Sequence, residues 1–114
     1  MLGFSANLQY YLCCQAIDMR NGFDGLAGIV RNSLKKNPIS GDVFIFLNKP
    51  RTHIKILYWD GDGFALFYKR LERGRYASTS HGEVSKQMSR EELMMLLEGL
   101  SFKDMNRKKR YRMA

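Results

Sequence analysis

The sequence predicts an α+β domain in which an antiparallel meander of about four or five strands is covered on one face by two helices. Three observations support this prediction. The chain has 114 residues, enough for one core of two packed layers, and 45% of them are hydrophobic. Short apolar or alternating runs bounded by turn residues fill its middle. Two segments with apolar side chains at helical spacing flank those runs. We assign 1–102 to this domain and 103–114 to a basic, flexible tail.

The first elements are a strand and a long helix. Residues 8–16, LQYYLCCQA, are rich in aromatic side chains and predict a strand. Asp18 is a candidate N-cap for a helix over 19–36, and Asn37-Pro38 ends that helix. Its apolar face would consist of Met19, Phe23, Leu26, Ala27, Val30 and Leu34.

Three strands are predicted next. VFIFLN at 43–48 is a short apolar run, HIKILYW at 53–59 alternates between two faces, and GFALFYKRL at 63–71 follows. The last two runs are separated by Asp60-Gly61-Asp62-Gly63, which contains two Asp-Gly pairs. This dipeptide between alternating runs is the strongest short-range signal for a hairpin.

The chain then predicts a short edge strand, a loop and a second helix. Gly74 allows a turn, after which Arg75 and Tyr76 begin the edge strand. Residues 78–87 are polar and predict a mobile loop. Ser89 begins a capping box, with Glu92 three residues later, and predicts a helix over 89–99. The apolar face of this helix would consist of Leu93, Leu96, Leu97 and Leu100.

The charge of the chain favours a polyanionic partner. Nineteen Lys and Arg against eleven Asp and Glu give a net charge of +8, which suits nucleic acid or an anionic membrane surface. No run approaches the roughly 18 apolar residues that span a bilayer, and the first residues do not resemble a signal peptide. We therefore expect a soluble, cytoplasmic protein in which the neighbouring Cys13 and Cys14 are reduced thiols. We expect no cofactor and no metal.

Asp60 and Asp62 raise the possibility of an acidic catalytic or metal-binding centre. An EF-hand loop that begins at Asp60 would need a glycine where the chain has Ala65 and a glutamate where it has Leu71. A two-metal nuclease would need several carboxylates from separate elements. Neither histidine lies near an obvious nucleophile. We therefore predict that the protein is not an enzyme and that the two aspartates form a turn, with a metal-dependent nuclease as an outside alternative.

Two basic regions are candidates for binding nucleic acid. In the first, cations interleave with Tyr68 and Tyr76, an arrangement that can hold phosphates and stack on bases, although a solvated edge strand explains it equally well. The second is the tail, whose six cations would give a log–log salt slope of roughly −5 if all met phosphates; a solubilising tail is its alternative. The candidates are Lys69, Arg70, Arg73, Arg75, Lys103, Arg107, Lys108, Lys109, Arg110 and Arg112.

A third feature suggests a protein interface. Gly22, Gly25 and Gly28 recur every third residue of the first predicted helix, although each glycine costs a helix up to about 1 kcal/mol relative to alanine. This pattern predicts the close approach of another backbone, first of all the chain's own sheet and otherwise a second protein. Large aromatic residues are the usual anchors of interfaces, and the candidates here are Tyr58, Trp59 and Phe64.

Four stretches carry a resemblance to a known family: DMRNGFDGLAGIV at 18–30, GDVFIF at 41–46, IKILYWDGDGFALFYKRLERGRY at 54–76 and LLEGL at 96–100. With these, the chain resembles over about residues 8–102 the TnpB accessory protein of insertion-sequence-66 class bacterial transposons. It departs at Ala77-Ser78-Thr79-Ser80, where that family commonly has Trp-Pro. The resemblance implies an accessory role beside a separate DDE-type transposase and assigns no catalytic residue.

Two functions remain open as hypotheses. The protein either binds transposon ends through its basic residues, or docks on the transposase or on itself without touching DNA. A buried pair of Arg70 and Glu72 would favour docking. One exposed surface formed by Lys69, Arg73, Arg75 and the tail would favour DNA.

Overall fold

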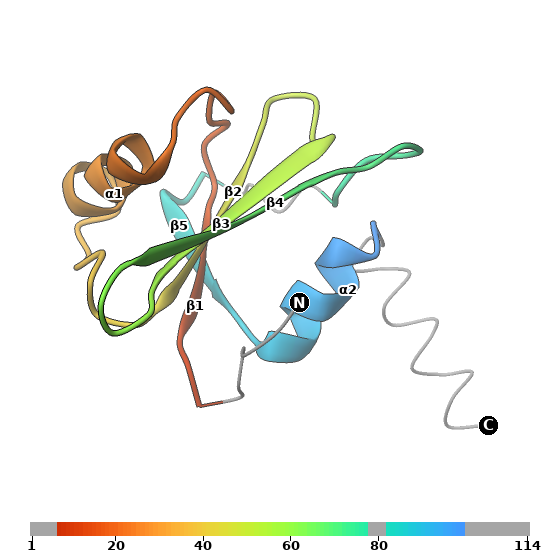
Figure 1. The fold of residues 1–114 in the computed structure, drawn as a ribbon. Coiled ribbons are helices and arrows are strands. Elements are labelled where there is room, and N and C mark those ends of the chain that lie inside the picture. Colours follow the sequence, from red (N-terminus) through yellow and green to blue (C-terminus); the bar gives the residue numbers. More distant parts are fainter. Residues whose placement is uncertain (1–6, 78–81, 100–114) are drawn as a thin grey trace.

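The computed structural model describes residues 7–77 and 82–99, and these form a five-stranded sheet and two helices (Figure 1). The α+β class is thereby confirmed. In chain order the elements are β1 (Tyr10–Cys13), α1 (Phe23–Asn32), β2 (Val43–Leu47), β3 (His53–Trp59), β4 (Phe64–Arg70), β5 (Ser85–Met88) and α2 (Arg90–Leu97).

The sheet is mixed and not purely a meander. Its strand order is β4-β3-β2-β1-β5, so β2, β3 and β4 form an antiparallel meander and β1 lies between β2 and β5. β1 runs parallel to β2, with Tyr10 opposite Val43, and antiparallel to β5. A parallel pair needs a crossover connection, and the segment that contains α1 provides it. β4 and β5 are consequently the two edges of the sheet.

The two helices lie on opposite faces of the sheet, which corrects the prediction that both cover one face. Leu26 and Val30 of α1 pack with Phe44 of β2, whereas Leu93 of α2 packs with the next β2 residue, Ile45. Successive side chains of a strand point to opposite faces, and Figure 1 shows the helices on the two sides of the sheet. The signal was present in VFIFL at 43–47, because a run that is apolar at every position is typical of a strand covered on both faces.

α1 is shorter than predicted at both ends. It spans Phe23–Asn32 in place of 19–36, and its N-cap is Gly22, which makes no side-chain capping hydrogen bond. Asp18 caps a turn before the helix, because its Oδ1 accepts the Arg20 N–H at 2.8 Å and its carbonyl accepts the Asn21 N–H at 3.1 Å. Asp, like Asn and Ser, stabilises such turns as readily as helix starts, so residue type alone did not distinguish the two.

The segment after β4 was also predicted incorrectly. Arg75 and Tyr76 are not a strand; their stretch is held by the Tyr76 N–H, which donates to the Arg51 carbonyl at 2.7 Å, and by Arg51 Nη1, which donates to the Tyr76 carbonyl at 3.2 Å. The fifth strand is Ser85–Met88, and its first three residues belong to the stretch 78–87 that was predicted as a loop. Its sequence SKQM has no apolar alternation, so only pairing with β1 makes it a strand.

The hairpin and the second helix are confirmed. Trp59 pairs with Phe64 across the Asp60–Gly63 turn, and the Asp60 N–H donates to the Gly63 carbonyl at 2.8 Å. Gly61 has a φ of +82°, which a glycine adopts without strain. α2 begins at Arg90, with the predicted capping box of Ser89 and Glu92 in place, and ends at Leu97, two residues before the predicted end.

The predicted boundary between domain and tail lies outside the described residues. None of the helices described is long and apolar enough to cross a membrane.

Candidate nucleic-acid interface

The first predicted basic region does not form one continuous surface. Lys69 points to the α2 face, where its Nζ donates to the Leu97 carbonyl at 2.8 Å. It therefore caps the carboxyl end of α2, whose own last turn contains no basic residue. Arg70 lies on the other face, because successive side chains of a strand point to opposite faces. The six tail candidates lie outside the described residues.

Arg70, Arg73 and Arg75 are the exposed cations of this region. Arg70 forms an ion pair with Glu72 at 2.9 Å, and its side chain is 64% exposed. The pair is therefore formed, but it is not buried, so the condition that would have favoured docking is met only in part. Within the described part of the chain, Arg73 and Arg75 have no ion pair. These arginines project from the end of β4 and the bend that follows it.

An exposed aromatic surface adjoins Arg70 on the α1 face. Tyr68 is 53% exposed, and its ring centroid lies 5.9 Å from that of His53 on the neighbouring strand. His53 Nδ1 lies 2.8 Å from Thr52 Oγ1 and 3.1 Å from Asn48 Nδ2, which fixes the imidazole ring. Together with Lys69, Arg70 and Glu72, the two rings line a shallow hollow. A flat ring beside an arginine is the combination that holds a base and its phosphate.

The structure adds Lys55, which the sequence did not single out. Its side chain is only 7% exposed, and its Nζ donates to the carbonyls of Met19 at 2.7 Å and Asn21 at 2.8 Å. The ammonium also lies 4.6 Å from the centre of the Tyr68 ring. Lys55 thus ties the loop before α1 to the sheet. Only its position on a central strand could have suggested burial, since lysines in alternating strands usually face solvent.

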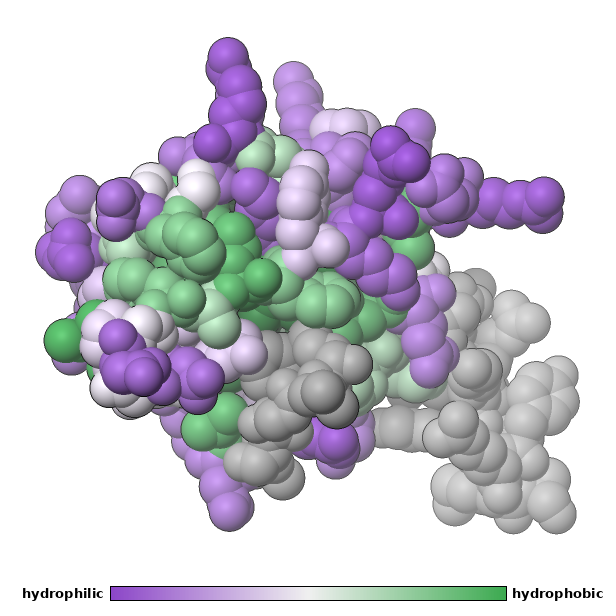
Figure 2. All heavy atoms as spheres, viewed as in Figure 1, coloured by the Kyte–Doolittle hydropathy of each residue, from purple (hydrophilic) through white to green (hydrophobic). Residues whose placement is uncertain are grey.

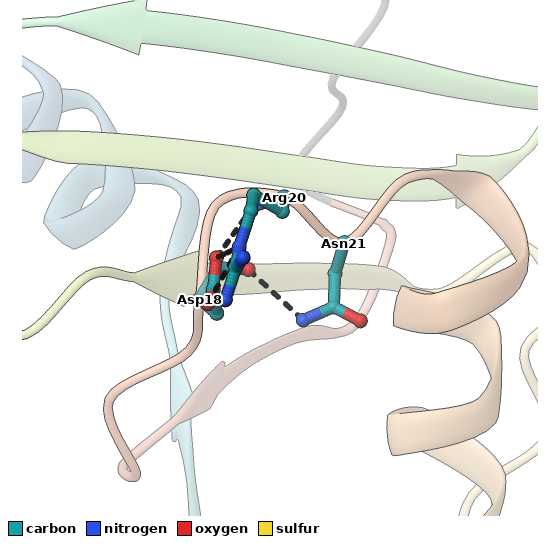
Figure 3. Close-up of polar contacts among 3 residues, drawn as sticks. All are labelled: Asp18, Arg20 and Asn21. Atoms are coloured by element: carbon teal, nitrogen blue, oxygen red, sulfur yellow. Dashed lines mark hydrogen bonds and ion pairs between the residues drawn. The ribbon is translucent and has the colours of Figure 1, made fainter.

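The loop that Lys55 holds presents Arg20 to solvent. Asp18 accepts from Arg20 Nε and Nη2 in a bidentate pair whose shortest distance is 2.7 Å, and the Asn21 side-chain amide donates to the Asp18 carbonyl at 2.9 Å (Figure 3). The Arg20 side chain is 92% exposed. Hydrogen bonds from Arg20 lower the pKa of Asp18 to about 2, so the carboxylate that orients this arginine stays charged near neutral pH.

The predicted partner surface has two parts that differ. A side chain at Gly22 or Gly28 would meet open space, so the close approach of the chain's own sheet predicted there is wrong. At Gly25 an added methyl group would collide with Asn21 Oδ1, which rests on the first turn of α1. Phe23, between the first two glycines, is 47% exposed.

The aromatic candidates lie around the hairpin. Trp59 and Phe64 are half-buried and meet edge to face with ring centroids 5.1 Å apart. Tyr58 is half-buried on the opposite face, packed against the α2 core. The hairpin therefore displays two aromatic rings on one side of the sheet and one on the other.

The acidic turn offers little to a metal. Asp60 and Asp62 are exposed, and within 7–77 and 82–99 no group of three or more His, Cys, Asp and Glu side chains could hold an ion. Both cysteine thiols are free, as expected, and burial raises the pKa of each. Protonated thiols are poor nucleophiles.

Comparison with known proteins gives a family match over most of the chain. The family described as "IS66 Orf2 like protein" matches residues 8–107. The "Uncharacterized protein y4jC" of Sinorhizobium fredii is 34% identical over 108 residues, which cover 95% of this chain and 92% of that protein. The "Uncharacterized protein y4hO" of the same organism is 35% identical over 103 residues, or 90% of each chain. No solved structure matches at a significant level.

Proposed function

The chain belongs to the IS66 Orf2 like family, which points to an accessory role in transposition, and we propose that it is non-catalytic and binds the DNA ends of its element to assist a separate transposase. The observation that carries the proposal is the exposed Tyr68 ring beside the exposed Arg70 at the end of β4, with the exposed Arg73 and Arg75 following in the chain. Arginine with an adjoining aromatic ring suits phosphate contacts and stacking on a base.

The four cations at the end of β4 and in the bend after it differ in what else they bind. Lys69 already donates to a backbone carbonyl and Arg70 shares its charge with Glu72. Arg73 and Arg75 have no such partner among the described residues, so they contribute most. Contacts of these arginines with phosphates would give a log–log salt slope of about −3, and contacts from the tail would make it steeper.

A binding assay with a matched control tests this assignment. We would follow fluorescence anisotropy of labelled transposon-end and scrambled duplexes over a salt series. Arg73→Gln/Arg75→Gln should weaken binding to both duplexes and reduce the slope by about 2. Arg31→Gln/Lys49→Gln removes the same charge from exposed positions elsewhere and should leave the slope nearly unchanged. The chain ending at Phe102 separates the contribution of the tail. If the intact, folded chain did not bind at low salt, the DNA proposal would be wrong.

Docking on the transposase is the second candidate function. It is favoured by Phe23, a large exposed ring next to Gly22, where nothing of the described chain fills the space. Co-purification with the transposase of the same element, lost in Phe23→Ser and kept in Arg73→Gln/Arg75→Gln, would favour docking over DNA binding.

A further inference from the structure

The outer edge of β4 is long, apolar and unpaired among the described strands. β4 has seven residues, and its first four, Phe64–Phe67, are all half-buried and apolar. Figure 2, which has the same view as Figure 1, shows an apolar band across the middle of the molecule, over β4. Hydrophilic side chains gather at both ends of this band. The other edge, β5, has four residues and the polar sequence SKQM. Short polar edges discourage pairing with other chains, whereas a long apolar edge is a template for it.

The two ends of β4 carry opposite charge. The turn before it contains the exposed Asp60 and Asp62. Its far end and the following bend contain Lys69, Arg70, Arg73 and Arg75 against the single acid Glu72. An antiparallel copy of the same strand would bring each acidic end alongside a basic end, whereas a parallel copy would bring like charges together. The two ends of β4 therefore have the opposite charges that pairing with an antiparallel copy of the same strand requires.

We propose that two copies of this chain associate through β4, antiparallel about a two-fold axis at Phe67, so that the two five-stranded sheets become one continuous sheet. Full overlap of β4 with its copy sets Phe64 opposite Arg70, Ala65 opposite Lys69 and Leu66 opposite Tyr68. Backbone hydrogen bonds then satisfy the open edge of each copy. An interface of this kind uses the same patch on both subunits, as two-fold dimers do.

Charge reversal with rescue by mixing tests both the surface and its orientation. Asp60→Lys/Asp62→Lys and Arg70→Glu/Arg73→Glu each place like charges together in a dimer with themselves. Each should weaken self-association about tenfold or more. Mixed together, the two variants restore opposite charges at both ends of the interface and should form a heterodimer. All four positions are exposed, and circular dichroism confirms that each variant folds.

The measurement is sedimentation velocity over a dilution series without DNA, on the full chain. We expect a dimer for the unaltered chain, monomers for each reversed variant and a dimer for their mixture. Arg31→Glu/Lys49→Glu, which changes exposed charges elsewhere, should leave the dimer intact. A monomer for the unaltered chain at all concentrations, reversed variants that still dimerise, or a mixture that stays monomeric would each overturn the proposal.

Ala65 provides a second test that leaves the turn and the arginines unchanged. Ala65→Lys places a lysine opposite Lys69 of the second copy and should weaken the dimer, whereas Ala65→Glu should strengthen it. Equal effects of the two variants would contradict the register. Because Arg70 and Arg73 also serve the proposed DNA contact, the DNA-free assay keeps failure of one proposal distinguishable from failure of the other.

Discussion

Lys55 and Tyr76 are polar side chains that are buried on opposite faces of the sheet, and their polar atoms are bonded differently. On the α1 face, Lys55 donates to two backbone carbonyls and lies over the Tyr68 ring. On the α2 face, Tyr76 is fully buried among apolar side chains, and its hydroxyl has no hydrogen-bond partner in the described part of the chain. A buried polar group stabilises a fold only when it is hydrogen-bonded. We therefore expect removal of the Lys55 ammonium to lower the free energy of unfolding and removal of the Tyr76 hydroxyl to raise it.

The difference follows from what each face must hold. On the α1 face, the loop before α1 lies over Lys55, and the backbone carbonyls of a loop need hydrogen-bond donors. Lys55 supplies such donors from the sheet. The α2 face is covered by a capped helix and a continuous apolar core, which needs no buried donor. The α1 face is thus built around a polar tie and the α2 face around apolar packing.

Lys55→Met should give the largest effect. It leaves the Met19 and Asn21 carbonyls without their donor, and hydrogen bonds to a charged group contribute about 1.5–3 kcal/mol. We expect the free energy of unfolding to fall by about 2–3 kcal/mol in urea titrations. Amide exchange at residues 18–22 should quicken more than exchange in α2. A decrease in the free energy of unfolding of less than about 1 kcal/mol would show that water replaces the ammonium at little cost. The contrast drawn between Lys55 and Tyr76 would then be wrong.

Tyr76→Phe should act in the opposite direction. Removing an unpaired buried hydroxyl should raise the free energy of unfolding by about 1 kcal/mol. Burial raises the pKa of Tyr76 from 10.0 to about 12, so the folded state retains this proton more tightly than the unfolded state does. Ionisation of Tyr76 therefore does not affect the free energy of unfolding below pH 10, and it lowers that free energy as the pH rises from 10 towards 12.

Thermal melts from pH 8 to pH 12 would measure both effects at once. The phenylalanine variant should lose less stability over the alkaline part of this range than the unaltered chain does. A variant that is less stable at neutral pH would mean that the hydroxyl has a partner in solution, such as a buried water.

The sequence predicted local structure well and long-range arrangement poorly, for physical reasons. The Asp-Gly hairpin and the Ser89 capping box are decided by neighbouring residues, and both are confirmed. β5 depends on β1, more than seventy residues away along the chain, and its own residues carry no strand signal. The α1 start likewise depends on Lys55, which draws residues 19–21 into a loop.

The candidate site shows the same division. Residue types identified Arg70, Arg73 and Arg75 as candidates for binding nucleic acid, and the structure places all three at the surface. Residue types did not reveal that Lys69 donates to the end of α2 or that Lys55 is buried, because a lysine carries the same charge whether it faces solvent or donates to a carbonyl. Which of the cations remain available to a partner is set by packing between distant elements.

Lys69→Met should give the smallest effect on stability and the sharpest contrast with Lys55. Lys69 is half-exposed and donates to one carbonyl at the end of α2, where a cation contributes about 0.3–1 kcal/mol. We expect urea titrations to show a loss in this range and amide exchange to quicken in the last turn of α2. Because the ammonium is already engaged, anisotropy should show little change in DNA binding, unlike Arg73→Gln/Arg75→Gln. A loss of DNA affinity equal to that of the double arginine variant would mean that the Lys69 ammonium leaves the Leu97 carbonyl to bind a phosphate.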